Sequence, residues 1–185
     1  MKLFLIVLLS LVLTGNALAI EIAGVNITSK TEIAGEELQL NGYGIRKKFV
    51  FVKVYVGSLY TSQKAASTAE VIALPGSKLI RMDFLHSKVD KKKIVDAFDE
   101  GFQKNSPQLV ATPEVRQFLA LFTKDFIEGD RVDLKLAANG DVTALHNGEN
   151  LGSVQSKELV QGILLIYLGE QPADADLKAG MLGKL

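Results

Sequence analysis

The sequence predicts an α+β fold, an open-faced β-sandwich with one large antiparallel sheet and a layer of helices on one face. Strand-like runs dominate the chain up to residue 85, amphipathic helical patterns follow, and a hairpin precedes the last helical segments. Because strands and helices come in separate runs and do not alternate, helices segregated to one side of an antiparallel sheet are favoured. Neither repeats nor low-complexity tracts interrupt this order.

Residues 1–19 are predicted to be a secretory signal peptide. Met1-Lys2 precedes an apolar run of about a dozen residues, and Ala17-Leu18-Ala19 supplies small residues at a cleavage site. The run is shorter than the roughly 20 apolar residues that span a bilayer. We therefore expect cleavage after Ala19, a periplasmic or secreted protein without a transmembrane span, and a single domain over residues 20–185.

The first strands lie in the glycine-rich N-terminal third. Short strands are expected over residues 20–28 and 37–42, followed by a longer one over 48–60. Strict alternation in this last run places Phe49, Phe51, Lys53 and Tyr55 on one face. Both faces are largely apolar, which favours a central strand with cover on each side.

A weak helix over residues 62–73, ended by Pro75-Gly76, leads into a strand over 78–85. A helix beginning near Asp90 then carries an apolar stripe at helical spacing. Thr112-Pro113 predicts the start of the next helix, because threonine caps N-termini and proline favours the first helical position. Its apolar stripe is Val115, Phe118, Leu119, Phe122 and Phe126.

The C-terminal third predicts a hairpin and two helices. Residues 131–137 and 141–146 read as strands joined at Asn139-Gly140, a dipeptide that favours a type I′ turn. Ser156 caps a helix that stops at Gly169, and a short helix over 173–181 follows.

Composition excludes several classes of function. Without the first 19 residues, the 21 basic and 21 acidic residues become 20 and 21, which argues against nucleic-acid binding. The chain has no cysteine, so it forms no disulfide and uses no thiolate chemistry. His86 and His146 have no third ligand at a metal-site spacing. No metal, cofactor or catalytic residue is predicted.

A cationic patch, Arg46-Lys47-Lys48, stands directly before the long strand that holds Lys53 and Tyr55. A guanidinium matches a carboxylate or phenolate with two parallel hydrogen bonds, and a tyrosine adds a hydroxyl and an apolar ring. Arg46 and Tyr55 are thus candidate ligands for a small amphipathic anion. The alternatives are a surface arginine lying over Tyr43 and a core tyrosine bonded to the backbone.

Lys53 and Arg81 are secondary candidates for the same site. Lys53 is either a second cation in the cleft or a lysine that reaches past the sheet edge into solvent. Arg81 lies in a strand beside Asp83 and is either an exposed cross-strand partner or a reserve ligand for the anion. The phenylalanine stripe of the second helix belongs to the core or, if sheet and helices part, to an acyl pocket.

Four segments together resemble the chalcone isomerase fold family, in the right order over about residues 22–184. They are GYGIRKKFVFVKVYVGSLYT, KLIRMDFLHSKVDKKKIVDAFDEGFQKN, VDLKLAANGDVTALHNGENLG and SKELVQGILLIYLGEQPADADLKAGMLG. The pattern is most similar to bacterial exported members. The resemblance implies a ligand cleft between sheet and helices, with Arg46 at the family's anion-holding arginine and Tyr55 at a position that is tyrosine in its fatty-acid binders.

The family includes both isomerases that cyclise chalcones and fatty-acid binders that perform no chemistry. The enzymes carry a tyrosine near the start of the helix after the second strand and an asparagine two turns later, whereas residues 90–101 (DKKKIVDAFDEG) hold neither. A non-catalytic binding protein for an amphipathic anion such as a fatty acid is therefore expected. The alternatives are an isomerase or lyase acting on a chalcone-like conjugated carbonyl, and an envelope protein with a protein partner.

Overall fold

The computed structural model describes residues 20–49 and 51–184. The predicted signal peptide over residues 1–19 and the predicted strand position Val50 lie outside these ranges.

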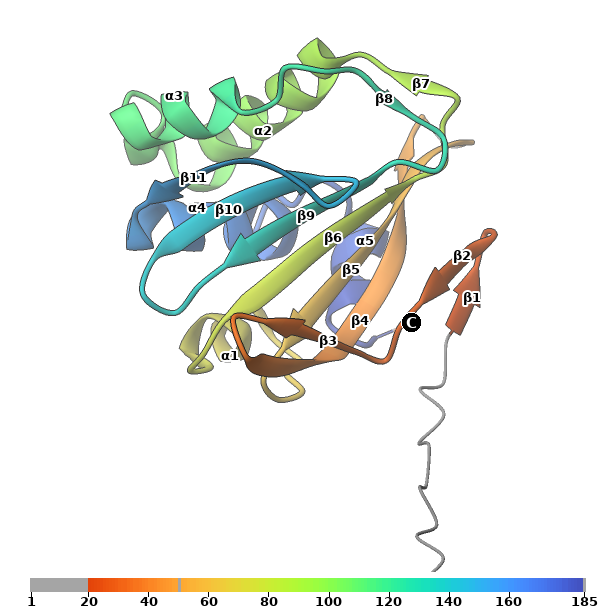
Figure 1. Ribbon diagram of the computed structural model, residues 1–185, viewed down its shortest axis with the longest axis horizontal. Helices are drawn as coiled ribbons and strands as arrows, with labels where there is room; N and C mark the ends of the chain where they lie inside the picture. The colour runs from red at the N-terminus through yellow and green to blue at the C-terminus, as the bar shows by residue number, and fades with distance from the viewer. Residues whose placement is uncertain (1–19, 50, 185) are drawn as a thin grey trace, which may run out of the picture.

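The centre of the molecule is a seven-stranded, fully antiparallel sheet in the order β11-β10-β9-β6-β5-β4-β3 (Figure 1). Each strand of the sheet pairs only with antiparallel neighbours. The strand bounds are β3 Lys30–Ile33, β4 Glu36–Lys48, β5 Val52–Thr61, β6 Lys78–Phe84, β9 Arg131–Leu136, β10 Asp141–His146 and β11 Glu149–Gln155. The predicted antiparallel sheet is confirmed.

Two short two-stranded sheets flank this sheet. The first pairs β1 (Ile20–Ile22) with β2 (Val25–Ile27), and the second pairs β7 (Lys88–Val89) with β8 (Phe126–Ile127). Ala23 and Gly24 both have positive φ, as a type I′ turn requires. Residues 20–28 therefore form a hairpin and not the single strand predicted.

Helices cover one face of the sheet, as predicted (Figure 1). Their bounds are α1 Thr68–Ala73, α2 Lys91–Asn105, α3 Pro113–Ala120, α4 Lys157–Leu168 and α5 Ala175–Met181, with a 3-10 turn over Pro107–Leu109. Side chains of Ser67, Thr112, Ser156 and Asp174 accept hydrogen bonds at four of the helix starts. On the other face a smaller apolar cluster forms around Leu38, Tyr60 and Leu79.

Glycines let the last helix approach the sheet closely. A Cβ at Gly42 would overlap the carbonyl oxygen of Gly180, and one at Gly44 would lie 3.0 Å from the Leu177 Cα. Glycine at these two positions of β4 therefore allows α5 to pack directly on the backbone of the sheet.

Further local predictions are wrong, including the placement of Phe122, which lies beyond the end of α3 at Ala120. The run 48–60 is not one strand, because β4 ends at Lys48, Phe49 has φ +52° and β5 starts at Val52. Gly140 has positive φ but Asn139 does not, so the β9–β10 turn is not type I′. Phe126 lies in β8, because α3 already ends at Ala120.

Aromatic rings fill the space between the sheet and the helices. Tyr55 packs on Phe84 with ring centroids 5.6 Å apart, and Phe84 stacks on Phe126 at 4.8 Å. The chain of contacts continues from Phe126 into the helices through Phe122, Phe98, Phe118 and Phe102. The core is therefore a continuous aromatic layer whose one end is Tyr55 on the sheet.

We expect Phe118→Ala to lower the free energy of unfolding by about 3–5 kcal/mol, because Phe118 is fully buried and its loss leaves a cavity. Phe51→Ala makes the same chemical change at a residue that is 89% exposed, so it should change stability by less than about 0.5 kcal/mol. Urea denaturation followed by circular dichroism measures both. Equal effects of the two substitutions would contradict this description of the core.

Candidate functional site: a cationic cleft at Arg46

A β-bulge in β5 determines which side chains reach the helix side of the sheet. Arg46 faces Tyr55 in the ladder, and Lys47 faces Lys53, so Val54 is an extra residue on β5. The Val54 carbonyl accepts hydrogen bonds from both Leu85 N–H and His86 N–H. Val54 packs against the same core cluster as Tyr55, whereas strict alternation would place the two on opposite faces.

Arg46 lies half-buried at the end of the aromatic layer. Its Nη1 donates to the Tyr55 hydroxyl at 3.3 Å, and its Cζ lies 5.6 Å from the centroid of the Tyr55 ring. In the alkaline range where a guanidinium titrates, the negative charge of the ionised Tyr55 raises the pKa of Arg46, whereas burial lowers it, and the net shift is upward. Arg46 therefore remains a cation at every pH of interest.

Arg46 has no carboxylate partner within ion-pair distance among residues 20–49 and 51–184. The charge of Asp174 adds only a minor upward shift to the pKa of Arg46. That carboxylate is engaged elsewhere, since it accepts from the N–H groups of Lys47 at 3.0 Å and Leu177 at 2.9 Å. Guanidinium donors that are partly withdrawn from water thus remain available to an anion.

Tyr167 of α4 lies beside this pair. Its hydroxyl donates to the Met82 Sδ at 3.2 Å and neighbours the hydroxyl of Tyr55. Burial, followed by the Tyr55 phenol, raises the pKa of Tyr167 well above its ordinary value. Sequence reasoning did not single out Tyr167 for the site, because nothing in a single sequence brings this residue of α4 to Arg46.

Two hollows meet at Arg46. The inner one is a cavity of about 10 Å³ between Arg46, Tyr55 and Tyr167, enough for about one water molecule. The outer one is an open cleft of about 340 Å³, near the lower limit of ligand pockets. Arg46, Ile94 and Ala97 line both, so the guanidinium stands between them.

The lining of the outer cleft combines apolar and cationic side chains. Its apolar lining comes from β5, β7 and α2 and consists of Val52, Val54, Val89, Ile94 and Ala97, with Phe49 at the turn. Its polar lining consists of Arg46, Lys48, His86, Lys88 and Lys93. The expected space between sheet and helices is filled by phenylalanines, so the cleft opens at the edge of the aromatic layer.

Lys53 and Arg81 are not brought to this cleft. The bulge turns Lys53 away from Val54, and its side chain is exposed. Arg81 lies on the opposite face over the Tyr60 ring, and binds Asp133 through two hydrogen bonds of 2.7 and 2.9 Å. Burial lowers the pKa of Arg81, but the hydrogen bonds and the charge of Asp133 raise it, and the net shift is upward. Its partner is Asp133 across the ladder, not the adjacent Asp83, which binds Arg131.

The polar residues that the sequence did not single out for the cleft are Lys48, His86, Lys88 and Lys93. Lys88 and Lys93 are exposed side chains around the start of α2, and they line the cleft together with Lys48. Within the described ranges, no three side chains of His, Cys, Asp or Glu form a metal-binding group. No helix among the described residues has the length and apolar character needed to span a bilayer.

Comparisons with known proteins agree with this architecture. The sequence profile of chalcone isomerase-like proteins matches residues 19–183. The chain belongs to the chalcone isomerase-like family. A solved member of similar structure is a fatty-acid-binding protein of Arabidopsis thaliana, with a TM-score of 0.69 and 19% identity over 89% of this chain and 95% of the other.

A similar curated sequence is fatty-acid-binding protein 1 of Arabidopsis thaliana, 20% identical over 171 residues. The alignment covers 86% of this chalcone isomerase-like chain but 61% of the relative, so the chain spans about three fifths of that protein's length. At these identities the comparison with the solved structure establishes the fold, and the residues of the site have to be argued from their own geometry.

The raised pKa of Tyr167 gives a pH dependence of stability. In the unfolded chain Tyr167 ionises near pH 10, whereas in the folded protein it keeps its proton to higher pH. Above about pH 10 the unfolded state therefore binds fewer protons, and stability falls as pH rises. The stability advantage of the wild-type protein over Tyr167→Phe should shrink from pH 8 to 11 in urea denaturation. A constant difference would show that Tyr167 is not buried as described.

Proposed function

We propose that this protein binds a small amphipathic anion, such as a fatty acid, without transforming it chemically. The observation that carries the proposal is the half-buried Arg46 guanidinium, free of a carboxylate partner among the described residues, at the inner end of an apolar cleft. Fatty-acid-binding protein 1 of Arabidopsis thaliana, to which the chain is similar in both sequence and structure, supports the same ligand class here.

The contacts define how such a ligand would lie. The carboxylate would accept hydrogen bonds from the Arg46 guanidinium, next to the Tyr55 hydroxyl that already orients it. The acyl chain would lie on Val52, Val54 and Ile94 in the outer cleft. Each methylene removed from water contributes about 0.8 kcal/mol, so a medium-length chain compensates for the cost of association.

Binding fits the lining of the cleft better than the cyclisation of a chalcone. In the inner cavity beside the Arg46–Tyr55 pair, α2 contributes only Ile94, Ala97 and Phe98, none of which transfers a proton, and its one polar side chain in the outer cleft is Lys93. An isomerase would use Arg46 to hold a phenolate near the alkene, and it needs further polar groups at the reacting atoms. Decay of chalcone absorbance in the presence of the protein, lost in Arg46→Gln, would favour the enzyme.

Binding of dodecanoate tests the role of Arg46. Because charge-assisted hydrogen bonds contribute on the order of 1.5–3 kcal/mol, Arg46→Gln should weaken the affinity roughly 10- to 100-fold. Lys53→Gln removes the same charge from an exposed site on the other face and should leave the affinity unchanged. Isothermal titration calorimetry measures both variants.

Dodecanol supplies the complementary control, since it has the same chain and no charge. Its affinity for the wild-type protein should be lower than that of dodecanoate and should not respond to Arg46→Gln. Failure of the wild-type protein to bind dodecanoate, with no shift of its melting temperature, would rule out the proposal. Equal losses in Arg46→Gln and Lys53→Gln would place the anion elsewhere.

We also propose that the protein acts in the periplasm or outside the cell, on the basis of the signal-like pattern of residues 1–19. The expected mature N-terminus is Ile20. Intact mass and N-terminal sequencing of the protein purified from its producing cells will measure this, and retention of Met1 in the active protein would contradict export by cleavage.

A further inference from the structure

The turn between β4 and β5 presents two solvent-exposed phenylalanine side chains. Phe49 is 81% exposed and Phe51 is 89% exposed, the highest values among the large apolar side chains of the described residues. Ile127 of β8, 55% exposed, lies at the same end of the molecule (Figure 1). A single exposed apolar residue is ordinary, whereas a group at one projecting end indicates an interaction site.

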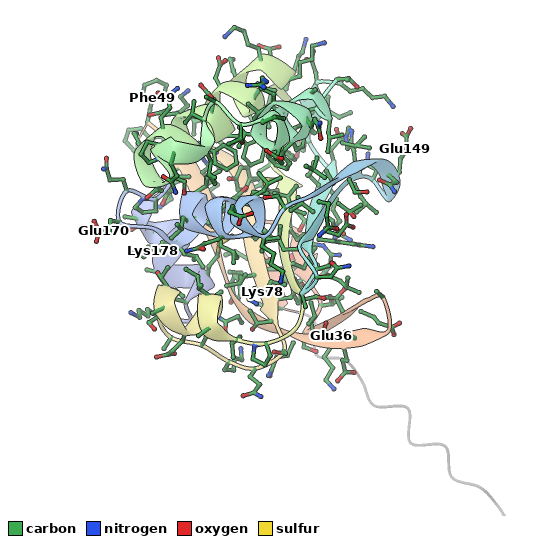
Figure 2. All side chains as sticks on the ribbon, turned by 90° about the vertical axis from the view of Figure 1, so that its left-hand side faces the viewer. Glu36, Phe49, Lys78, Glu149, Glu170 and Lys178 are labelled. Atoms are coloured by element: carbon green, nitrogen blue, oxygen red, sulfur yellow. The ribbon has the colours of Figure 1, made fainter. Side chains whose placement is uncertain are left out.

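The backbone holds these rings outward. The β4–β5 ladder continues to the pair of Lys48 and Val52, so the turn is fixed on both sides. Phe49 has φ +52°, a left-handed conformation that a residue with a side chain adopts only at an energetic cost. Figure 2 shows Phe49 at the end of the molecule opposite Glu36, at the outer edge of the fold.

Lysines surround the turn. Lys47, Lys48 and Lys53 flank it on the two strands, and Lys48 and Lys53 form no ion pair within the described part of the chain. Lys88 and Lys93 stand across the cleft and share the carboxylates of Asp90 and Asp125. Lys47 lies 3.7 Å from Asp176. Asp176, Asp90 and Asp125 thus offset the charge of the outer lysines, and among the described residues the unpaired positive charges beside the two phenylalanines are those of Lys48 and Lys53.

We propose that the β4–β5 turn docks on an anionic lipid bilayer, with Phe49 and Phe51 inserted among the acyl chains and Lys48 and Lys53 bound to the headgroups. A lipid bilayer can rearrange around a projecting turn and take up its two aromatic rings. The lysines on either side of the turn complement the acidic headgroups. A rigid protein partner would have to offer a matching acidic pocket.

Docking would place the cleft next to the membrane surface. Phe49 and Lys48 belong both to the turn and to the lining of the cleft that ends at Arg46. A lipid that leaves the bilayer could enter the cleft without crossing water. The docking step itself does not depend on the proposed ligand, so either proposal can fail without the other.

A tryptophan at the tip reports its insertion directly, because the chain contains no tryptophan. In Phe51→Trp, vesicles of phosphatidylcholine with phosphatidylglycerol should shift the emission to the blue, and brominated acyl chains should quench it. Phosphatidylcholine vesicles alone should have a weaker effect, and added salt should reverse the shift. Ala69→Trp, on exposed α1 at the opposite end of the sheet, is the matched control and should not respond (Figure 1).

Vesicle co-sedimentation measures the energetics. Lys48→Gln and Lys53→Gln should each lower the partition coefficient about fivefold, and Phe49→Ser with Phe51→Ser at least about tenfold. All variants carry the same N-terminus, checked by mass, so residues 1–19 contribute equally if they are retained. Unchanged melting temperatures are expected, because these side chains are exposed.

No response of the Phe51→Trp emission to anionic vesicles at low salt would overturn the proposal. So would an equal response of Ala69→Trp, which indicates adsorption without orientation. A blue shift that depends on protein concentration and not on vesicles would assign the turn to contacts between copies of the chain, and the membrane proposal would then be abandoned.

Discussion

The aromatic layer between the sheet and the helices is the constraint on which the rest of the structure depends. It runs without a gap from Tyr55 through Phe84 and Phe126 into α2 and α3. Protein interiors pack at the density of organic crystals, so a layer of this kind leaves no room for a second molecule. The cleft is consequently confined to the edge of the layer, where Tyr55 meets Arg46.

The position of the Arg46 guanidinium follows from the same constraint. Tyr55 is fully buried and needs a partner for its hydroxyl, and the cross-strand position opposite it is Arg46. The tyrosine thereby holds the guanidinium against the protein, where hydration is reduced and an anion is bound more strongly than in water. Arg81 illustrates the contrast, since Asp133 across the ladder neutralises its charge through two hydrogen bonds.

The sequence was a good guide where local signals agree. Thr112-Pro113 and Ser156 start helices as expected, and the hairpin of residues 131–146 has its predicted strands. It failed at the β4–β5 turn, since the run FVF contains none of the usual turn residues and reads as uninterrupted strand. No sequence signal indicates the bulge at Val54 either. Strict alternation without the bulge places Lys53 on the same face as Tyr55. The grouping of Arg46 with Tyr55 was expected from the cationic patch before the strand and from the family resemblance, whereas their cross-strand register was not.

The start of α2 breaks a local rule at the mouth of the cleft. Lys91, Lys92 and Lys93 occupy its first turn, where the helix dipole disfavours cations, and the N-cap Asp90 makes no side-chain capping bond. Departures from local preference of this kind tend to mark functional positions. Lys93 belongs to the lining of the cleft, across from Lys48 of the β4–β5 turn. Interactions between exposed charges are largely screened beyond a Debye length of about 8 Å, so an anion responds to the nearby charges and not to the net charge of the chain. A chain of zero net charge therefore still presents one basic end to an anion.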